Sequence, residues 1–173
     1  MAARPHRQLA EPMVVFRIGD PDGAFAIYSA EGARRVSGRW HRKGQAVIYA
    51  SAAYSTAMLE RLVHYSGQLP RGQHVIEITI PARTSYEVVT PDSVPGWERK
   101  DGRAARAFGS RWLDDGRSAI LIVPSVVART ERNVLINPAH ADAARIKPGL
   151  EAPVTWDERL FVPAVAPGRG RAG

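Results

Sequence analysis

The chain has 173 residues, of which 45% are apolar and 24% are charged, a globular composition that excludes an intrinsically disordered chain. It contains no cysteine, so disulfides, cysteine-ligated zinc and thiol catalysis are excluded. The formal net charge of +7 is compatible with nucleic acid, an acidic protein or a phosphate-bearing ligand as partner, and it does not choose among them.

The length predicts a single domain, because typical domains contain roughly 100–200 residues. We assign this domain to residues 13–163. Residues 1–12 and 164–173 are rich in Pro, Gly, Ala and Arg and lack apolar periodicity, so they are predicted to be flexible tails. The longest apolar runs have about six residues, far fewer than the roughly 18 that span a bilayer, and the N-terminus has no hydrophobic signal region. The sequence therefore predicts a soluble, cytoplasmic protein with no membrane contact.

The first part of the chain contains two predicted strands and a helix. Residues 13–18 are apolar and β-branched and end at a turn rich in Gly and Asp, so they predict a buried strand. Residues 46–50 predict a second strand after a basic loop. Apolar residues then recur at three- and four-residue spacing, which predicts a helix capped by Ser51 or Ser55 and ended by Gly67.

The middle of the chain adds strands and one covering helix. Residues 73–80 alternate between apolar and polar, which predicts a strand with one solvent-exposed face. Residues 85–89 are predicted to continue this strand or to pair with it in a meander. Residues 102–113 predict a helix that covers the sheet. The continuous apolar run at 119–123 predicts a strand buried on both faces.

Residues 133–137 and 159–162 predict the last two strands. Strands outnumber helices and do not alternate with them regularly. The fold class is therefore predicted to be α+β, with twisted, mostly antiparallel strands in one sheet or two facing sheets and with flanking helices.

Several common catalytic motifs are absent from the sequence. It has no phosphate-binding P-loop, no dinucleotide-binding glycine motif, no HExxH and no GxSxG, and its five histidines lack the spacing of metal ligands. We therefore expect a site without a metal. His41 and His64 have no visible Asp or Ser companion, so each is interpreted as an ordinary loop or helix-surface residue rather than an acid or base.

Two charged residues stand out by their positions. Arg17 lies near the end of an apolar strand, where a guanidinium needs either an acidic partner or an anionic ligand. No acidic residue occurs between Gly32 and Leu59, so Glu60 is the first carboxylate after a basic run. Pairing of Glu60 with a neighbouring cation is the structural alternative. The combination predicts a site for a phosphorylated small molecule.

Four further residues complete the candidate set. Arg39 lies in the basic loop, Tyr49 at the end of a predicted strand, Ser125 after the central strand and Asn137 at the end of the next strand. Core packing is the alternative for Tyr49, and an ordinary turn serine is the alternative for Ser125. Each of these residues is a weak signal when it is taken alone.

In this order the candidates resemble the RES-domain family, which is named for its Arg, Glu and Ser positions. The resemblance runs from about residue 14 to residue 161. Four stretches carry it: VFRI at 15–18, GRWHRKGQAVIYAS at 38–51, AMLERLVH at 57–64, and AILIVPSVV followed by NVLINPAH at 119–140. The chain departs from the family at His41, where an Asn is expected, and in the AHAD turn after Pro138.

The resemblance implies a fold similar to that of ADP-ribosyltransferases and a toxin of a type II toxin–antitoxin pair. Its partner would be an Xre-type helix-turn-helix antitoxin. The substrate would be NAD, broken between nicotinamide and ribose, with inorganic phosphate or water as the acceptor. No other cofactor is implied.

The resemblance also implies roles for the candidate residues. Glu60 would stabilise positive charge on the ribose or orient the nucleophile. Arg17 and Arg39 would bind the pyrophosphate, because a guanidinium matches phosphate oxygens with two donors. Tyr49 would stack on nicotinamide or ribose. Ser125 and Asn137 would form hydrogen bonds to the amide of nicotinamide or to ribose hydroxyls.

Three alternatives stay open from the sequence. The first is an ADP-ribosyltransferase that modifies a macromolecule, since it needs the same NAD site. The second is a nucleic-acid-binding module built on the basic segment 99–111, although interleaved acidic residues and the absence of a recognition helix argue against it. The third is a protein that only binds its partner. For the antitoxin, we expect contacts between its acidic residues and the loop containing Arg39 and Arg42.

Overall fold

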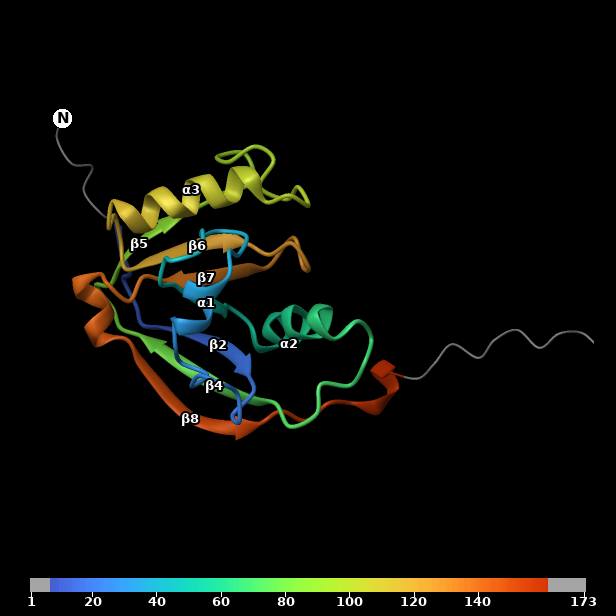
Figure 1. The fold of residues 1–173 in the computed structure, drawn as a ribbon. Coiled ribbons are helices and arrows are strands. Elements are labelled where there is room, and N and C mark those ends of the chain that lie inside the picture. The colour runs from blue at the N-terminus through green and yellow to red at the C-terminus, as the bar shows by residue number, and fades with distance from the viewer. Residues whose placement is uncertain (1–6, 162–173) are drawn as a thin grey trace, which may run out of the picture.

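The computed structural model describes residues 7–161, which form one eight-stranded sheet with flanking helices (Figure 1). The strand order is β1-β5-β6-β7-β3-β2-β4-β8. The strands are β1 Arg7–Gln8, β2 Met13–Gly19, β3 Ile48–Ser51, β4 His74–Ile80, β5 Ser85–Val88, β6 Ile120–Pro124, β7 Arg132–Ile136 and β8 Lys147–Pro153. The helices are α1 Glu31–Arg35, α2 Tyr54–Leu62 and α3 Arg103–Asp114, with 3₁₀ helices η1 Val63–Tyr65, η2 Ala141–Arg145 and η3 Glu158–Phe161.

The predicted α+β class with a mostly antiparallel sheet is confirmed. Every strand pair recorded in residues 7–161 is antiparallel except β5 with β6. Helix α3 lies alongside β5 and β6, and α2 lies near the ends of the central strands (Figure 1). Within the same residues, none of the helices combines the length and the apolar character that a membrane crossing requires.

The sheet is nearly divided at its centre. Strand β2 pairs with β4 along its whole length, from Met13 to Gly19, but it shares a single registered pair with β3, Phe16 opposite Ser51. Most backbone groups of β3 therefore have no registered partner in β2. We call this break in the backbone pairing between the two half-sheets the opening.

One core cluster lies beneath α3. Ala105 and Trp112 of this helix are fully buried against Leu121 of β6 and Leu135 of β7. The indole Nε1 of Trp112 donates a hydrogen bond of 2.8 Å to Ser118 Oγ, so the one polar atom of this side chain is paired. Helix α3 therefore covers the sheet as the sequence predicts.

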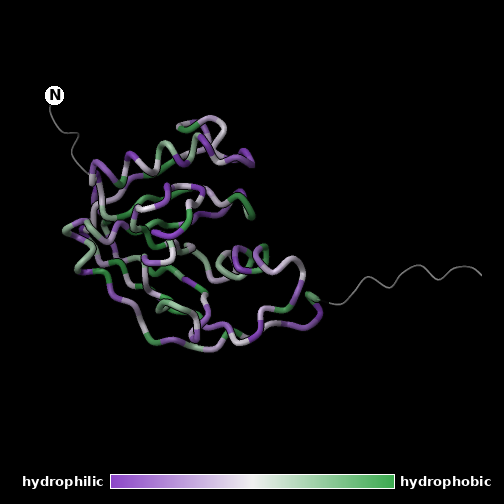
Figure 2. Tube along the Cα trace, in the orientation of Figure 1, coloured by the Kyte–Doolittle hydropathy of each residue, from purple (hydrophilic) through white to green (hydrophobic). Residues whose placement is uncertain are grey.

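A second core cluster joins the two half-sheets. It draws apolar residues from the central strands and from the segments that connect them, and its members include Val15, Ile27, Ile48, Ile76, Ile78, Ile120, Val134, Ile136 and Ile146. The hydrophobic stretches of the chain run along the strands, while the connecting segments are mostly hydrophilic (Figure 2). The opening between β2 and β3 is thus supported by a continuous apolar layer.

Two strand predictions are wrong. Strand β5 does not pair with β4 in a meander, because β2 and β8 occupy both edges of β4, and β5 instead pairs with β1 and, in parallel, with β6. The strand expected at 159–162 is a 3₁₀ helix over Glu158–Phe161, and residue 162 lies outside the described residues. The last strand is β8, a segment with two prolines and a glycine whose residues are all exposed.

The N-terminal boundary and the helix cap also differ from expectation. Strand β1 lies inside the predicted tail 1–12, and Leu9 N donates to the Thr84 carbonyl at 3.0 Å, so the ordered domain includes residues from position 7. The predicted tails at 1–6 and 164–173 lie outside the described residues. Helix α2 has Ala53 as its N-cap, with no side-chain cap, so neither predicted serine caps it. Ser51 ends β3 and its hydroxyl donates to Asn133, and Ser55 lies inside the helix.

Candidate active site

The carboxylate of Glu60 is held by two side chains from neighbouring strands. Its Oε1 accepts hydrogen bonds from Ser125 Oγ at 2.8 Å and from Asn133 Nδ2 at 2.6 Å. Within residues 7–161 no hydrogen bond reaches Glu60 Oε2, and no cation forms an ion pair with this carboxylate. Two donors therefore fix one oxygen and leave the other available to a ligand.

Ser125 orients Glu60 and is itself oriented by the backbone. Its side chain is fully buried, and its Oγ accepts hydrogen bonds from Val127 N at 3.2 Å and Ala128 N at 3.0 Å. With both acceptor positions of the hydroxyl used, its proton is directed to Glu60. Because two backbone N–H groups occupy its oxygen and its proton is donated to Glu60, we interpret Ser125 as a positioning residue.

Asn133 is the residue that sequence reasoning missed. It is the second residue of β7, opposite Val123 of the antiparallel strand β6, and therefore lies at the same end of the sheet as Ser125. Its Oδ1 accepts a 2.7 Å hydrogen bond from Ser51 Oγ, so Ser51 and Asn133 form a chain that ends at Glu60. The available signal is topological, since the start of an antiparallel strand lies beside the end of its partner.

Asn137 is not brought to Glu60. It lies at the opposite end of β7, where its backbone N donates to the Ala119 carbonyl. Its side-chain Oδ1 accepts from Ala139 N at 3.1 Å and so stabilises the turn after the strand. The structure therefore gives Asn137 a structural contact, and Asn133 occupies the position beside Glu60.

Arg17 reaches into the opening between the half-sheets. Its Nη1 donates a 2.9 Å hydrogen bond to the carbonyl of Tyr49, one of the β3 groups that β2 leaves unpaired. Burial and, to a smaller extent, the positive charge of Arg61 lower the pKa of the guanidinium to about 10, so Arg17 is still charged at neutral pH. In residues 7–161 the salt bridge considered as an alternative for Arg17 does not form.

Tyr49 and His41 share a buried hydrogen-bond network. His41 is only 2% exposed, and its Nε2 lies 2.9 Å and 3.0 Å from the carbonyl oxygens of Ala33 and Val36. Because carbonyls only accept, Nε2 carries the proton, and Nδ1 accepts from the Tyr49 hydroxyl at 2.8 Å. Burial raises the pKa of Tyr49, which keeps the phenol neutral. His41 thus fixes Tyr49 instead of acting on a ligand.

The network requires a glycine at position 38. A β-carbon there would lie 2.6 Å from His41 Cε1 and 2.8 Å from the Tyr49 hydroxyl, which is closer than side-chain contacts allow. The Tyr49 hydroxyl also accepts from Trp40 N at 3.2 Å. The conformation of the loop before β3 is therefore tied to the position of the Tyr49 ring.

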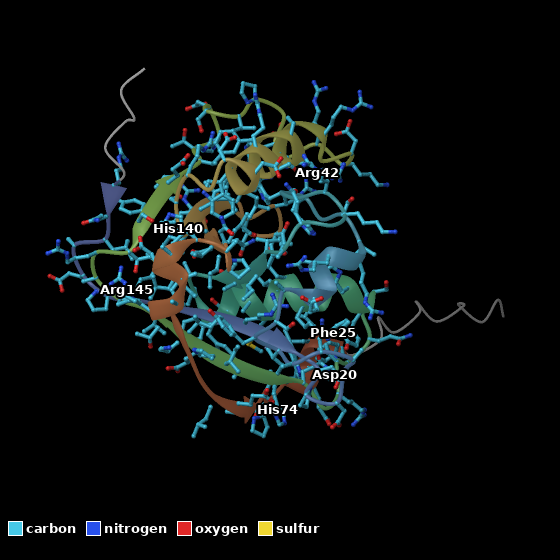
Figure 3. The ribbon with its side chains drawn as sticks, turned by 60° about the vertical axis from the view of Figure 1, so that its left-hand side comes forward. Asp20, Phe25, Arg42, His74, His140 and Arg145 are labelled. Atoms are coloured by element: carbon cyan, nitrogen blue, oxygen red, sulfur yellow. The ribbon has the colours of Figure 1, made fainter. Side chains whose placement is uncertain are left out.

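Arg39 anchors a distant loop. Its Nη1 donates to the carbonyls of Trp97 at 3.0 Å and Arg99 at 2.8 Å, in the segment that precedes α3. Its charge still acts on Tyr49, where it opposes the rise in pKa. Arg42 lies beside α3 (Figure 3) and pairs with Asp114 at 2.9 Å. Both arginines have structural contacts, and the remaining donors of Arg39 face no carboxylate in residues 7–161.

The structure therefore brings most of the predicted residues to one region. Glu60 and Ser125 are in direct contact, Arg17 contacts the backbone of Tyr49, and Arg39 lies close enough to act on the Tyr49 hydroxyl. The arrangement offers one oriented carboxylate oxygen and several guanidinium donors around an opening in a sheet. Such a set suits a ligand that carries phosphate at one end and a centre of developing positive charge at the other.

The chain is similar to known proteins in sequence. The RES domain model matches residues 14–157. A Sphingobium protein named "Prs ADP-ribosylating toxin" is 42% identical over 138 residues, covering 77% of this chain and 86% of the relative. A Pseudomonas putida protein named "Toxin Res" is 37% identical over 152 residues, covering 86% of this chain and 100% of the relative.

The fold also has a solved counterpart. A chain in the crystal structure of the M. tuberculosis MbcT–MbcA toxin–antitoxin complex superposes with a TM-score of 0.69, covering 86% of this chain and 87% of that chain. Its sequence identity is 14%, so this comparison concerns the fold alone. The family is shown by the sequence matches: with the RES domain model aligned to residues 14–157, this chain belongs to the RES-domain family.

Proposed function

We propose that this protein is a toxin of a toxin–antitoxin system that consumes NAD by breaking the bond between nicotinamide and ribose. One observation carries the proposal: Glu60 is held through a single oxygen by Ser125 and Asn133, which leaves Oε2 for a substrate. The RES-domain relatives named as toxins support the same conclusion.

The reaction needs a group that stabilises a cationic sugar. When the N-glycosidic bond breaks, its electron pair leaves with nicotinamide, which becomes neutral, and the ribose C1 develops oxocarbenium character. The Glu60 carboxylate supplies negative charge without having to reorient, because its hydrogen bonds are already formed in the free protein. Water or inorganic phosphate then adds to C1 and completes the reaction by hydrolysis or phosphorolysis.

The remaining site residues would bind and position NAD. Arg17 offers its free donors to the pyrophosphate from inside the opening. Arg39 offers the donors that Trp97 and Arg99 do not use. The Tyr49 ring is partly exposed and its hydroxyl is fixed by His41, so the ring would present an immobile face to nicotinamide or ribose.

A second candidate is transfer of ADP-ribose to a macromolecule. The relative that is 42% identical carries the name "Prs ADP-ribosylating toxin", and this name favours transfer in that protein. Transfer and degradation share the cleavage of the nicotinamide bond and differ only in the acceptor. Both therefore need the same Glu60 site.

The partner would be an antitoxin of the Xre helix-turn-helix type. The solved neighbour of this fold comes from a toxin–antitoxin complex, which supports an antitoxin as the partner but does not bear on its type. We propose that acidic antitoxin residues meet the loop of Arg39 and Arg42. A complex that forms equally well with Arg39→Glu and Arg42→Glu would contradict this contact.

The test is to incubate the purified full chain with NAD, with and without inorganic phosphate, and to follow nicotinamide release. Release that needs phosphate would indicate phosphorolysis, and release without it would indicate hydrolysis. A parallel reaction with NAD labelled in its adenylate phosphate and a cell extract would reveal transfer to a macromolecule. Intact NAD in every reaction would contradict both candidates.

Asn133→Ala is expected to lower kcat for nicotinamide release by about tenfold, because Glu60 loses one of the two donors that orient it. The KM for NAD should change by less than about threefold, since Asn133 is not assigned to substrate binding. Steady-state kinetics measures both constants. Asn137→Ala is the matched control, and an equal loss of kcat in that variant would contradict the positions assigned to the two asparagines.

A further inference from the structure

Arg61 is a second guanidinium at the opening, and neither the sequence motifs nor the family resemblance assigns it a role. It follows Glu60 on α2, and its Nε donates a 2.6 Å hydrogen bond to Gln73 Oε1. Its Nη2 lies 3.3 Å from the Tyr65 hydroxyl, and its guanidinium carbon lies 5.2 Å from the centre of the Tyr65 ring. These contacts fix one side of the guanidinium and leave Nη1 without a protein partner in residues 7–161.

The side-chain amide of Gln73 fixes the orientation of Arg61. Its side chain is only 3% exposed, and its Nε2 donates to the Arg71 carbonyl at 3.3 Å, so its Oε1 is directed at Arg61. A buried amide with both ends used holds its partner in one orientation. Arg61 is therefore preorganised in the free protein.

Arg61 and Arg17 form a pair of cations without a counter-ion. In residues 7–161 neither guanidinium forms an ion pair with a carboxylate, and the rest of the chain contains no acidic side chain. Arg17 lies opposite Ile76 near the start of β4, and Arg61 is held by Gln73, the residue just before β4, so strand pairing brings both side chains to the same end of β4. The charge of Arg61 accordingly lowers the pKa of Arg17. Two partly buried like charges repel each other, and an anion between them would remove that cost.

Helix α2 points its two charged residues at different half-sheets. Glu60 reaches Ser125 and Asn133 beside β6 and β7, whereas Arg61 reaches Gln73, which precedes β4. His74, the residue after Gln73, lies on the opposite side of the molecule from Arg42 (Figure 3). The helix therefore bridges the opening, with its carboxylate on one side and its guanidinium on the other, beside Arg17.

We propose that Arg61 and Arg17 form a two-arginine phosphate site, with Arg61 as a binding residue that sets the position of a phosphate-bearing ligand relative to Glu60. Two guanidiniums offer donors to both phosphates of a pyrophosphate, or to one inorganic phosphate ion. For the pyrophosphate of NAD the inference rests on the proposed function. The anion site itself does not depend on it.

The test is isothermal titration calorimetry of the full chain with inorganic pyrophosphate and, separately, with inorganic phosphate at low salt. Arg61→Gln should weaken binding about tenfold or more, because it removes a charged donor. Arg7→Gln removes the same charge from the distant edge strand β1 and should leave binding unchanged. Binding to Arg61→Gln within twofold of the unmodified protein would overturn the proposal.

The two anions identify the source of the phosphate. If both bind with the same dependence on Arg61, the site accepts an inorganic phosphate co-substrate, and if only pyrophosphate does so, the site is for a dinucleotide. Both results support an anion site at Arg61. If neither anion binds the unmodified protein, the proposal is overturned. Circular dichroism checks that each variant folds. If Arg61→Gln does not fold, Arg61→Lys is used instead, with an expected loss of affinity of about fivefold, because lysine keeps the positive charge but lacks the paired donors of the guanidinium.

Kinetics separates this inference from the proposed function. With NAD as substrate, Arg61→Gln should raise KM about tenfold and leave kcat within about threefold, because Arg61 binds a part of the substrate that does not react. If the unmodified protein leaves NAD intact, the proposed function fails and the anion titrations still decide the role of Arg61. If NAD is cleaved with an unchanged KM in Arg61→Gln, the inference fails and the proposed function stands.

Discussion

Glu60→Gln is expected to lower kcat for nicotinamide release by about 10²- to 10³-fold, the loss typical of removing one preorganised electrostatic group. Glutamine has nearly the same shape as glutamate, and its Oε1 still accepts from Ser125 and Asn133. The substitution therefore removes the negative charge and keeps the packing. The KM for NAD should change little, because the charge acts on the cationic sugar of the transition state. Steady-state measurement of nicotinamide release gives both constants.

Glu77→Gln is the matched control for this prediction. Glu77 lies on β4 and its side chain is exposed, so the same loss of charge occurs outside the opening. Its kcat should equal that of the unmodified protein, and the urea unfolding midpoints of both variants should stay close to the original. A kcat for Glu60→Gln within about threefold of the original would contradict the catalytic assignment of Glu60.

The part of the fold that the sequence predicts correctly is the part with strong periodicity. The apolar run at 119–123 and the alternating run at 73–80 match β6 and β4 closely. A strand buried on both faces has a continuous apolar sequence, and a strand buried on one face alternates between apolar and polar residues. Helix α3 is likewise recovered within a residue at each end. Its core residues Ala105 and Trp112 recur at helical spacing.

The elements that are not predicted from the sequence have no such hydrophobic pattern. Strand β8 is held by backbone pairing with β4, and Leu150 within it is 94% exposed, so no apolar pattern marks it. The parallel pairing of β5 with β6 depends on a crossover through α3, which local sequence does not encode. Pairing partners are decided by the whole sheet and not by any one segment.

The candidate site divides in the same way. Glu60 and Ser125 are predictable because each has a chemical type and a position that suit a site, and the structure joins them directly. The sequence does not distinguish Asn133 from Asn137, because which end of β7 lies beside Ser125 depends on the direction of the strands. Arg61 has no distinctive sequence signal, because a basic residue beside a helix border is common. Its significance comes from the absence of an acidic partner within residues 7–161.

Gly109→Ala is expected to lower the free energy of unfolding by about 3 kcal/mol, the upper end of the usual cost of overpacking. Gly109 lies in α3 where the helix meets the loop before β3. A β-carbon there would overlap the Trp40 carbonyl oxygen and would lie 2.9 Å from its carbonyl carbon. Both are backbone atoms, so they move only if the helix moves. Urea denaturation followed by circular dichroism measures the change.

The sign of this effect distinguishes packing from helix propensity. Alanine is favoured over glycine in a helix by about 1 kcal/mol, so an isolated α3 would be stabilised by the substitution. Gly32→Ala makes the same change in α1, where the nearest atom to the new β-carbon is Phe25 Cδ2 at 4.0 Å, and it should leave stability unchanged or raise it. Stabilisation by Gly109→Ala would mean that α3 does not rest on the Trp40 backbone. The loop that contains Arg39 and His41, and through His41 fixes Tyr49 of β3, would then lack this support, and the preorganised site would need a different explanation.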